Sequence, residues 1–251
     1  MILLAADYVG MKIVEWLVSV GESIDVLIYD AQNHGGTMPA ILDIVSSLNN
    51  IDIFSSEEFK TEEVKQILIR QNHDFGILGW WPYILSEEEI RITKRGFINT
   101  HPAYLPYNRG KHPYFWSIVE ETKFGVSIHW ITENIDDGAV IEQEEISVSW
   151  LDTGESLYIK SRNKMIELFK KVYYQVKENR DCAIVQDSSI CTFHYGKELE
   201  PYCQLKLENS YTAREVINIL RGRMFDQKGM AYFIDGNKKY YVSISIREED
   251  I

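Results

Sequence analysis

Residues 2–29 read ILLAADYVGMKIVEWLVSVGESIDVLIY, and this stretch decides the fold. The apolar run Ile2–Ala6 predicts a buried strand, and Ile24–Tyr29 predicts a second one. Between them, Met11–Val20 repeats apolar residues at helical spacing, and the face that we expect to be buried carries Ile13, Trp16, Leu17 and Val20. A strand, a helix and another strand in this order are typical of a βαβ unit with parallel strands.

The same alternation continues along the chain. Further strands are predicted at Phe75–Leu78, Phe97–Asn99, Val126–Ile131 and Val140–Val148. Helices are predicted at Thr61–Arg70, with Val64, Ile67 and Leu68 inward, and from Glu155 to about Lys177, with Asp152 or Thr153 as the N-cap. We therefore expect an α/β fold with an open, mostly parallel sheet, whose ligand crevice lies at the C-terminal ends of the strands.

The character of the sequence changes at the polar segment Glu178–Ser189. Beyond it, Ala213–Arg221 has a helical pattern, and the runs Met230–Ile234 and Tyr240–Ile246 flank Asp235-Gly236-Asn237, which predicts a β-hairpin. The sequence thus predicts a catalytic domain over residues 1–180 and a small α+β appendage over 181–251 that ends in the hairpin.

The composition limits the function classes. The chain has 251 residues, of which 45% are apolar, enough for one substantial core. A net charge of −12 argues against a nucleic-acid partner but permits a phosphorylated small molecule, which needs only a local positive site. Cys182, Cys191 and Cys203 lack metal or disulfide spacing and predict free thiols. Met1–Ala6 is too short for a signal or membrane segment, and no later segment approaches the length of a membrane span, so we expect a cytoplasmic protein without a membrane partner.

The chemistry-bearing stretch is Asn99-Thr100-His101-Pro102-Ala103-Tyr104-Leu105-Pro106, followed downstream by Asp136-Asp137-Gly138. Asn99 and His101 alternate after an apolar run, so both side chains are expected on one side of a strand. An amide can donate to a developing oxyanion, an imidazole can take a proton near neutral pH, and a carboxylate can orient the imidazole. This combination suits transfer of an acyl group to an amine. Taken alone, a His-Pro pair after a strand is more often structural, and Asp-Asp-Gly is a common turn.

The combined pattern is more specific. It consists of Asn99-x-His101, Leu105-Pro106, Arg109-Gly110, Gly125-Val126, His129 and Asp136-x-Gly138. Together these residues resemble the folate-dependent formyltransferase family, whose members formylate initiator methionyl-tRNA, glycinamide ribonucleotide or nucleotide-linked amino sugars. The C-terminal segments Phe193–Lys197 and Asn218–Arg221, with the closing hairpin, resemble a trimmed form of the appendage on the tRNA and sugar enzymes.

The resemblance implies a Rossmann-like formyltransferase fold, N10-formyltetrahydrofolate as the formyl donor, and Asn99, His101 and Asp136 as the catalytic residues. His101 can act as a base toward the attacking ammonium or as a donor to the oxyanion, and the sequence leaves both open. His129 is expected to be a core or supporting residue. The six histidines show no metal-ligand spacing, so we expect no metal.

Two ligand-binding regions follow from the same resemblance. The run Gly79–Ile84 lies where the family has the loop that grips the pterin ring, so Trp81, Tyr83 and Ile84, together with Asp136, are the predicted folate contacts. The segment Tyr107–Trp116 mixes basic and aromatic residues. Its residues Arg109, Lys111 and Trp116, with Tyr8 near the first helix, are the predicted substrate contacts. The alternative, a loop that positions the catalytic strand, is favoured nearly as much.

The sequence of Tyr107–Trp116 most resembles the corresponding segment of enzymes that act on dTDP-linked amino-deoxy sugars. We therefore expect formylation of dTDP-4-amino-4,6-dideoxyglucose, for surface polysaccharide such as the O-antigen of lipopolysaccharide. The 3-amino isomer is the nearest alternative. Methionyl-tRNA is disfavoured by charge, and glycinamide ribonucleotide by the added C-terminal segment. A non-catalytic nucleotide-sugar binding protein on the same fold remains the alternative of a different class.

Aromatic residues in the predicted hairpin also favour a homodimer. Tyr232, Phe233, Tyr240 and Tyr241 lie in a unit too small to bury them by itself. Exposed aromatic surface of this kind is typical of an interface between subunits.

Overall fold

A seven-stranded sheet organises the first of two units in the computed structural model, which describes residues 1–225 and 230–250. Unit 1 comprises Met1–His101, Ser127–Glu142 and Met165–Gln186, and unit 2 comprises Pro102–Val126, Gln143–Lys164 and Asp187–Ile251. The units interleave along the chain, and each is described by itself. The domain division expected at residue 180 stays a prediction.

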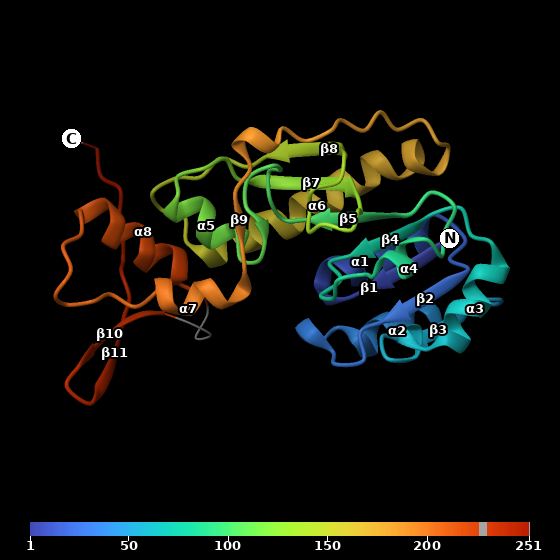
Figure 1. Cartoon of the computed structure of the whole chain (residues 1–251), viewed down its shortest axis with the longest axis horizontal. Helices are drawn as coiled ribbons and strands as arrows, with labels where there is room; N and C mark the ends of the chain where they lie inside the picture. The colour runs from blue at the N-terminus through green and yellow to red at the C-terminus, as the bar shows by residue number, and fades with distance from the viewer. Residues whose placement is uncertain (226–229, 251) are drawn as a thin grey trace. The chain divides into compact units, whose positions relative to one another are not determined.

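The strand order in the sheet is β3-β2-β1-β4-β5-β7-β8 (Figure 1). Neighbouring strands from β3 to β5 pair in parallel, and β5 pairs with β7 in the antiparallel sense. The open, mostly parallel sheet predicted from the sequence is therefore confirmed. The strands are β1 (Ile2–Ala5), β2 (Val26–Tyr29), β3 (Asp52–Ser55), β4 (Gly76–Gly79), β5 (Phe97–His101), β7 (Gly125–Trp130) and β8 (Val140–Glu145).

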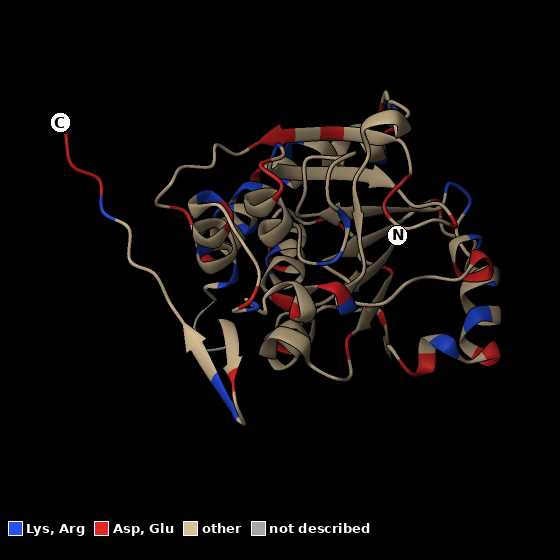
Figure 2. Cartoon of the chain, turned by 60° about the vertical axis from the view of Figure 1, so that its left-hand side comes forward, with Lys and Arg blue, Asp and Glu red and all other residues tan. Residues whose placement is uncertain are grey.

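The central strands are buried because their sequences are continuous apolar runs; all four residues of β1 and of β4 are buried. The edge strand β8 is different, since it carries Glu142, Glu144 and Glu145, and Figure 2 shows acidic segments along it. Charged side chains on an edge strand discourage pairing with another sheet. Strand β8 also ends three residues earlier than predicted, at Glu145 instead of Val148.

The helices of the chain from its start to residue 177 are α1 (Asp7–Ser19), α2 (Met38–Val45), α3 (Glu62–Gln71), α4 (Glu87–Ile90), α5 (Pro113–Val119) and α6 (Gly154–Lys177). Helix α1 begins at Asp7, four residues before the predicted start, directly after β1. Val20, predicted to face inward, is 43% exposed because the helix has ended before it. Trp16 packs edge-on against Phe169 and Tyr173. The predicted helix and the two strands around it are otherwise confirmed.

Helix α1 packs so closely on β4 that positions 10 and 79 require glycine. A Cβ atom on Gly10 would lie 2.6 Å from the carbonyl oxygen of Gly79. This approach fixes the start of α1, and with it Tyr8, against the C-terminal end of β4.

Unit 2 contains α5, the first eleven residues of α6 and the C-terminal elements. A two-stranded sheet pairs β6 (Arg109–Gly110) with β9 (Phe193–His194) in parallel. Thr153 caps α6, since its hydroxyl accepts a hydrogen bond from the backbone N–H of Ser156 at 3.1 Å. The remaining helices are α7 (Leu199–Tyr202) and α8 (Ala213–Arg223), with short 3-10 turns at Ser188–Ile190 and Gly196–Glu198.

The predicted hairpin is present as β10 (Ala231–Asp235) and β11 (Lys238–Val242). Its second strand starts and ends earlier than predicted, and Asp235 pairs with Lys238 at the tip, where Figure 2 shows the two charge signs meeting. Tyr240 is 41% and Tyr241 58% exposed, whereas Tyr232 is buried. The hairpin thus leaves part of its aromatic surface open.

Among residues 1–225 and 230–250, no helix has the length and apolar character needed to cross a membrane.

Candidate active site

Strand β5 positions Asn99 and His101 on one face, because successive side chains of a strand point to opposite sides. Thr100, between them, points the other way and ties β5 to β4. Its hydroxyl donates to the carbonyl oxygen of Leu78 at 2.9 Å and accepts the backbone N–H of Trp80 at 3.1 Å. The sequence prediction ended this strand at Asn99; the structure extends it to His101.

Asp136 reaches the same place from the turn after β7. Its Oδ2 lies 3.4 Å from Nδ1 of His101, and its Oδ1 lies 3.3 Å from Nδ2 of Asn99. The His101 and Asp136 side chains are only 7% and 11% exposed. The structure therefore brings together the three residues predicted to be catalytic, although they come from two separate segments of the chain.

His129 joins this cluster from β7, where it pairs with Asn99 across the antiparallel ladder. Its Nδ1 lies 2.8 Å from the carbonyl oxygen of Trp130, so Nδ1 carries the proton in the neutral ring. Its Nε2 is then an acceptor, 3.3 Å from the Asn99 amide nitrogen. Asn99 thus has its amide orientation set by two acceptors, His129 and Asp136.

The two aspartates of the turn have different partners. Asp137 accepts hydrogen bonds from the Thr132 hydroxyl and, at 2.8 Å, from the Asn134 amide. It therefore closes its own loop, while Asp136 faces His101 and Asn99.

Local backbone geometry explains why Asp136 can point inward. Asp136 has φ +52°, the left-handed region that aspartate tolerates better than most residues. Gly138 must lack a side chain, because a Cβ there would lie 1.8 Å from the carbonyl oxygen of Trp130. The Asp-x-Gly spacing is thus a geometric requirement of this turn.

Gln186 holds the turn from a segment far along the chain. Its side-chain amide donates to the carbonyl oxygens of Asp136 at 2.9 Å and of Gly138 at 2.7 Å. Nearby, Ile184 forms a β-bridge with Val140. The sequence analysis missed Gln186, since a glutamine in a polar linker gives no signal of a partner fifty residues away.

The predicted folate-binding residues lie after β4, within unit 1. Trp81 is 9% exposed and packs in the core, with its ring centroid 5.4 Å from that of Tyr83. Tyr83 donates its hydroxyl hydrogen to Oδ1 of the buried Asp30 at 2.8 Å. Ile84 is 70% exposed. An exposed aliphatic side chain beside fixed aromatic rings fits the apolar wall that a flat pterin ring needs.

The predicted substrate-binding residues are divided between the units. Tyr8 lies at the start of α1 in unit 1, with the Lys12 ammonium 5.7 Å from its ring. Arg109 is in β6 of unit 2, and Lys111 follows that strand, its backbone N–H donating to His194 at 3.0 Å. Trp116, also in unit 2, is 3% exposed and stacks on the His194 ring at 3.8 Å. Its ring fills the core around α5, so a direct contact with substrate stays an untested prediction.

The described residues contain no group of three or more His, Cys, Asp or Glu side chains that could hold a metal ion.

Comparison with known sequences identifies the family of the chain. The sequence model of the formyl transferase family matches residues 23–173, which include Asn99, His101 and Asp136. The chain belongs to the formyl transferase family. A second model, the N-formyltransferase dimerization C-terminal domain, matches residues 198–248, which include α8 and the hairpin.

Curated relatives of this family include two kinds of enzyme. The methionyl-tRNA formyltransferase of Fusobacterium nucleatum is 32% identical over 69% of this chain and 56% of its own length. The dTDP-4-amino-4,6-dideoxyglucose formyltransferase of Mycobacterium bovis is 28% identical over 61% of this chain and 65% of its own. The chain therefore spans less than two thirds of the length of both relatives.

Solved structures share the fold over nearly the whole chain. A 4-N formyltransferase from Francisella tularensis has a TM-score of 0.79 and 24% identity, over 99% of this chain and 98% of that one. An N-formyltransferase from Helicobacter canadensis, in complex with folinic acid and dTDP-3-aminofucose, has a TM-score of 0.68 and 18% identity. The match covers 88% of this chain and 78% of that one.

Proposed function

We propose that this member of the formyl transferase family transfers a formyl group from N10-formyltetrahydrofolate to the primary amine of a dTDP-linked amino-dideoxy sugar. The observation that carries the proposal is the cluster of Asn99, His101 and Asp136 at the end of β5. There the carboxylate oxygens of Asp136 lie 3.3 Å from the amide nitrogen of Asn99 and 3.4 Å from Nδ1 of His101.

The cluster can carry the chemistry as follows. The neutral amine attacks the formyl carbon, and the carbonyl oxygen becomes an oxyanion. The Asn99 amide, held in place by His129 and Asp136, donates to that oxygen when one of its two N–H groups exchanges its present acceptor for the oxyanion. The C–N bond to the folate then breaks, N10 receives a proton, and the amine loses one, so the formamide and tetrahydrofolate leave.

His101 is the group that handles the proton. Its Nδ1 lies 3.4 Å from Asp136 Oδ2, and we assign Nε2 as the atom that exchanges a proton with the reacting groups. A neutral His101 takes the proton of the attacking amine at Nε2, and a protonated one donates to the oxyanion. Asp136 stabilises the charged imidazole in both cases.

For the formyl donor, we propose that the loop after β4 holds the pterin. Trp81 and Tyr83 form the fixed part, Ile84 gives the apolar contact, and Asp136 lies at the reacting end. The folinic acid bound by the Helicobacter canadensis protein supports a folate donor in this fold.

For the acceptor, our choice is dTDP-4-amino-4,6-dideoxyglucose, with Tyr8, Arg109 and Lys111 as proposed contacts and Trp116 as a further candidate. The Mycobacterium bovis relative, named for this sugar, and the 4-N enzyme from Francisella tularensis support it. The 3-amino isomer is the second candidate, because the Helicobacter canadensis structure contains a 3-amino sugar nucleotide. A role in surface polysaccharide synthesis in the cytoplasm, as a homodimer, completes the proposal.

The deciding experiment is a mass-spectrometric assay of dTDP-linked 4-amino and 3-amino sugars with the folate donor. We expect the mass gain of one CO on the 4-amino sugar, and a faster reaction than on the 3-amino sugar. Initiator methionyl-tRNA and glycinamide ribonucleotide are run alongside. Preferred turnover of either would overturn the sugar proposal, and binding of the nucleotide sugar without any formylation would favour the non-catalytic alternative.

A further inference from the structure

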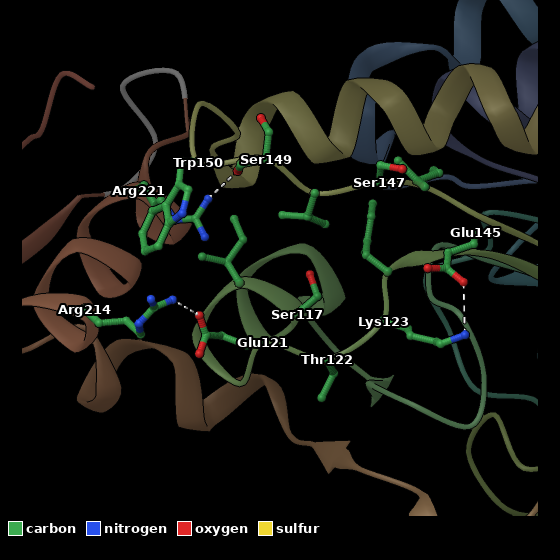
Figure 3. A pocket seen from close by; sticks show the side chains of 14 residues that line it. Ser117, Glu121, Thr122, Lys123, Glu145, Ser147, Ser149, Trp150, Arg214 and Arg221 are labelled. Carbon is green, nitrogen blue, oxygen red and sulfur yellow. Dashed lines mark hydrogen bonds and ion pairs between the residues drawn. The ribbon is translucent and has the colours of Figure 1, made fainter. Parts of the chain in front are cut away.

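A cavity of about 390 Å³ lies within unit 2, and its lining includes none of the residues proposed to bind folate or the acceptor. Its walls come from the end of α5, from residues 122–124, from residues 145–150 and from α8 (Figure 3). Trp150 and Arg221 lie at one end, and Lys123 and Glu145 at the other. The volume is in the range of small-molecule sites.

Arg221 is the unusual member of this lining. The residue is only 5% exposed. Nη1 donates to the backbone carbonyl oxygens of Ser149 at 2.7 Å and of Asp152 at 3.1 Å, and Nε donates to the amide oxygen of Asn218 at 2.9 Å. All three acceptors are neutral. Nη2 has no hydrogen-bond or ion-pair partner among residues 1–225 and 230–250.

A buried cation without an ion pair is rare, because burial removes the water that stabilises its charge. Burial lowers the pKa of Arg221, while Asp152 and Glu121 act to raise it. Both carboxylates are already engaged: Asp152 pairs with Lys160 at 2.7 Å, and Glu121 with Arg214 at 2.7 Å. The charge of Arg221 is therefore only partly compensated by the protein.

Two further cations line the cavity, and each is paired with a carboxylate: Arg214 with Glu121 at 2.7 Å and Lys123 with Glu145 at 3.1 Å. The guanidinium carbons of Arg214 and Arg221 each lie 4.9 Å from the centroid of the Trp150 ring. Serine and threonine hydroxyls at Ser117, Thr122 and Ser147 line the rest of the wall. In a chain with 26 basic and 38 acidic residues, two arginines on one aromatic ring are a local exception to the overall charge.

We propose that this cavity binds the oxyanion group of a small molecule, a phosphate or a carboxylate, which accepts hydrogen bonds from Nη2 of Arg221 and from Arg214. A guanidinium suits both groups, because its paired N–H donors match two oxygens of the same anion. The site operates independently of the formyl acceptor, so it goes beyond the proposed function.

Binding is measured by isothermal titration of the full chain with inorganic phosphate and, separately, with acetate, at ionic strength held constant by sodium chloride. We expect one site per chain for at least one of these anions, and the stronger of the two identifies the oxyanion class. Bound anion also raises the melting temperature by mass action.

The variants remove the site without removing the fold. Arg214→Gln deletes an exposed cation, and Ser147→Phe fills the cavity from an exposed position. Each should weaken anion binding by about tenfold or more. Arg70→Gln, which removes an exposed arginine of α3, is the matched control and should leave binding unchanged. Arg221→Lys is tested as well, but its loss of bonds to Ser149 and Asp152 makes it the less clean variant.

Two results would overturn the proposal. The first is that neither phosphate nor acetate binds saturably, or that Arg214→Gln and Ser147→Phe leave the binding of the anion unchanged. The other is loss of phosphate binding when dTDP saturates the enzyme, together with a raised KM for the nucleotide sugar in Arg214→Gln, since the cavity would then belong to the acceptor. Neither result depends on whether the proposed sugar is the correct one.

Discussion

Asp136 and Asp137 are adjacent in sequence, but their carboxylates have different partners. Replacing Asp136 by asparagine keeps the shape and removes the charge beside His101, so kcat should fall by about two orders of magnitude or more. His101→Asn should be at least as damaging. Asp137→Asn keeps one of the two acceptor oxygens, and the side chain contacts its own loop instead of His101, so most activity should remain. Steady-state kinetics on the three variants, with folding checked by circular dichroism, tests this. An inactive Asp137→Asn beside an active Asp136→Asn would contradict the assignment.

Gln186 offers a second prediction at the residue scale. Gln186→Leu removes both donors to the Asp136–Gly138 turn, so Asp136 loses its fixed position. We expect kcat to fall about tenfold to a hundredfold, with little change in KM for the acceptor. Gln66→Leu, on the exposed face of α3, is the control. A Gln186→Leu enzyme with normal kcat would show that the turn holds its geometry without this amide.

At the scale of elements, the end of β2 is tied to the loop after β4 through Asp30. Burial acts to raise the pKa of Asp30, but hydrogen bonds from Tyr83, His34 and Gln32 outweigh it and hold the pKa below its ordinary value. Because the pKa is lower in the folded state than in the unfolded state, the ionised carboxylate stabilises the fold at pH values above its unfolded-state pKa. This stabilisation is lost as the pH falls through the folded-state pKa.

Asp30→Asn should therefore lower the free energy of unfolding by about 1–2 kcal/mol at pH 7, since a charged acceptor is replaced by a neutral one. The difference from the wild type should shrink below about pH 4, where the unfolded and then the folded carboxylate are protonated. Urea titrations at pH 7, 5 and 3.5 give the comparison. A difference that grows toward low pH would have the wrong sign for this explanation.

The elements also show what the sequence could predict. Strand β1 could be predicted from the continuous apolar run Ile2–Ala6, and helix α3 from the helical spacing of Val64, Ile67 and Leu68. Both patterns arise because buried positions require apolar side chains. Strand β3 was missed, since Asp52-Ile53-Phe54-Ser55 is a short edge strand with little burial. Helix α2 was missed because it is short and carries Pro39 in its first turn.

The candidate site divides in the same way. Asn99, His101 and Asp136 could be predicted because a family motif marks them. The contribution of His129 and Gln186 depends on strand register and on a contact across fifty residues, which no local pattern contains. The separate role of Asp137, which accepts hydrogen bonds from two residues of its own loop, is likewise not visible in the sequence.

For the whole molecule, the hairpin is the predicted dimer contact. Tyr240 and Tyr241 keep 41% and 58% of their surface exposed, and residues 198–248 match a domain described as a dimerization domain. Tyr240→Ser combined with Tyr241→Ser should shift the protein toward monomer in sedimentation velocity at micromolar concentration. Tyr195→Ser, at a comparably exposed tyrosine outside the hairpin, should not. A wild type that sediments as a monomer contradicts the prediction.

The second prediction at this scale concerns metals. The proposed chemistry uses side chains and folate, so exhaustive chelation should leave turnover unchanged. Activity that disappears on chelation and returns with zinc would require a different mechanism.

The bonds from Gln186 to the Asp136 turn have a consequence for the order in which the enzyme matures during synthesis. The chain emerges from its N-terminus, so Asn99, His101 and Asp136 are all made well before Gln186, which follows Asp136 by fifty residues. Until that glutamine arrives, the carbonyl oxygens of Asp136 and Gly138 lack the amide that holds them. A ribosome-bound chain stalled at residue 180 thus contains every proposed catalytic side chain and still lacks the group that holds the carboxylate, so full activity should appear only late in translation.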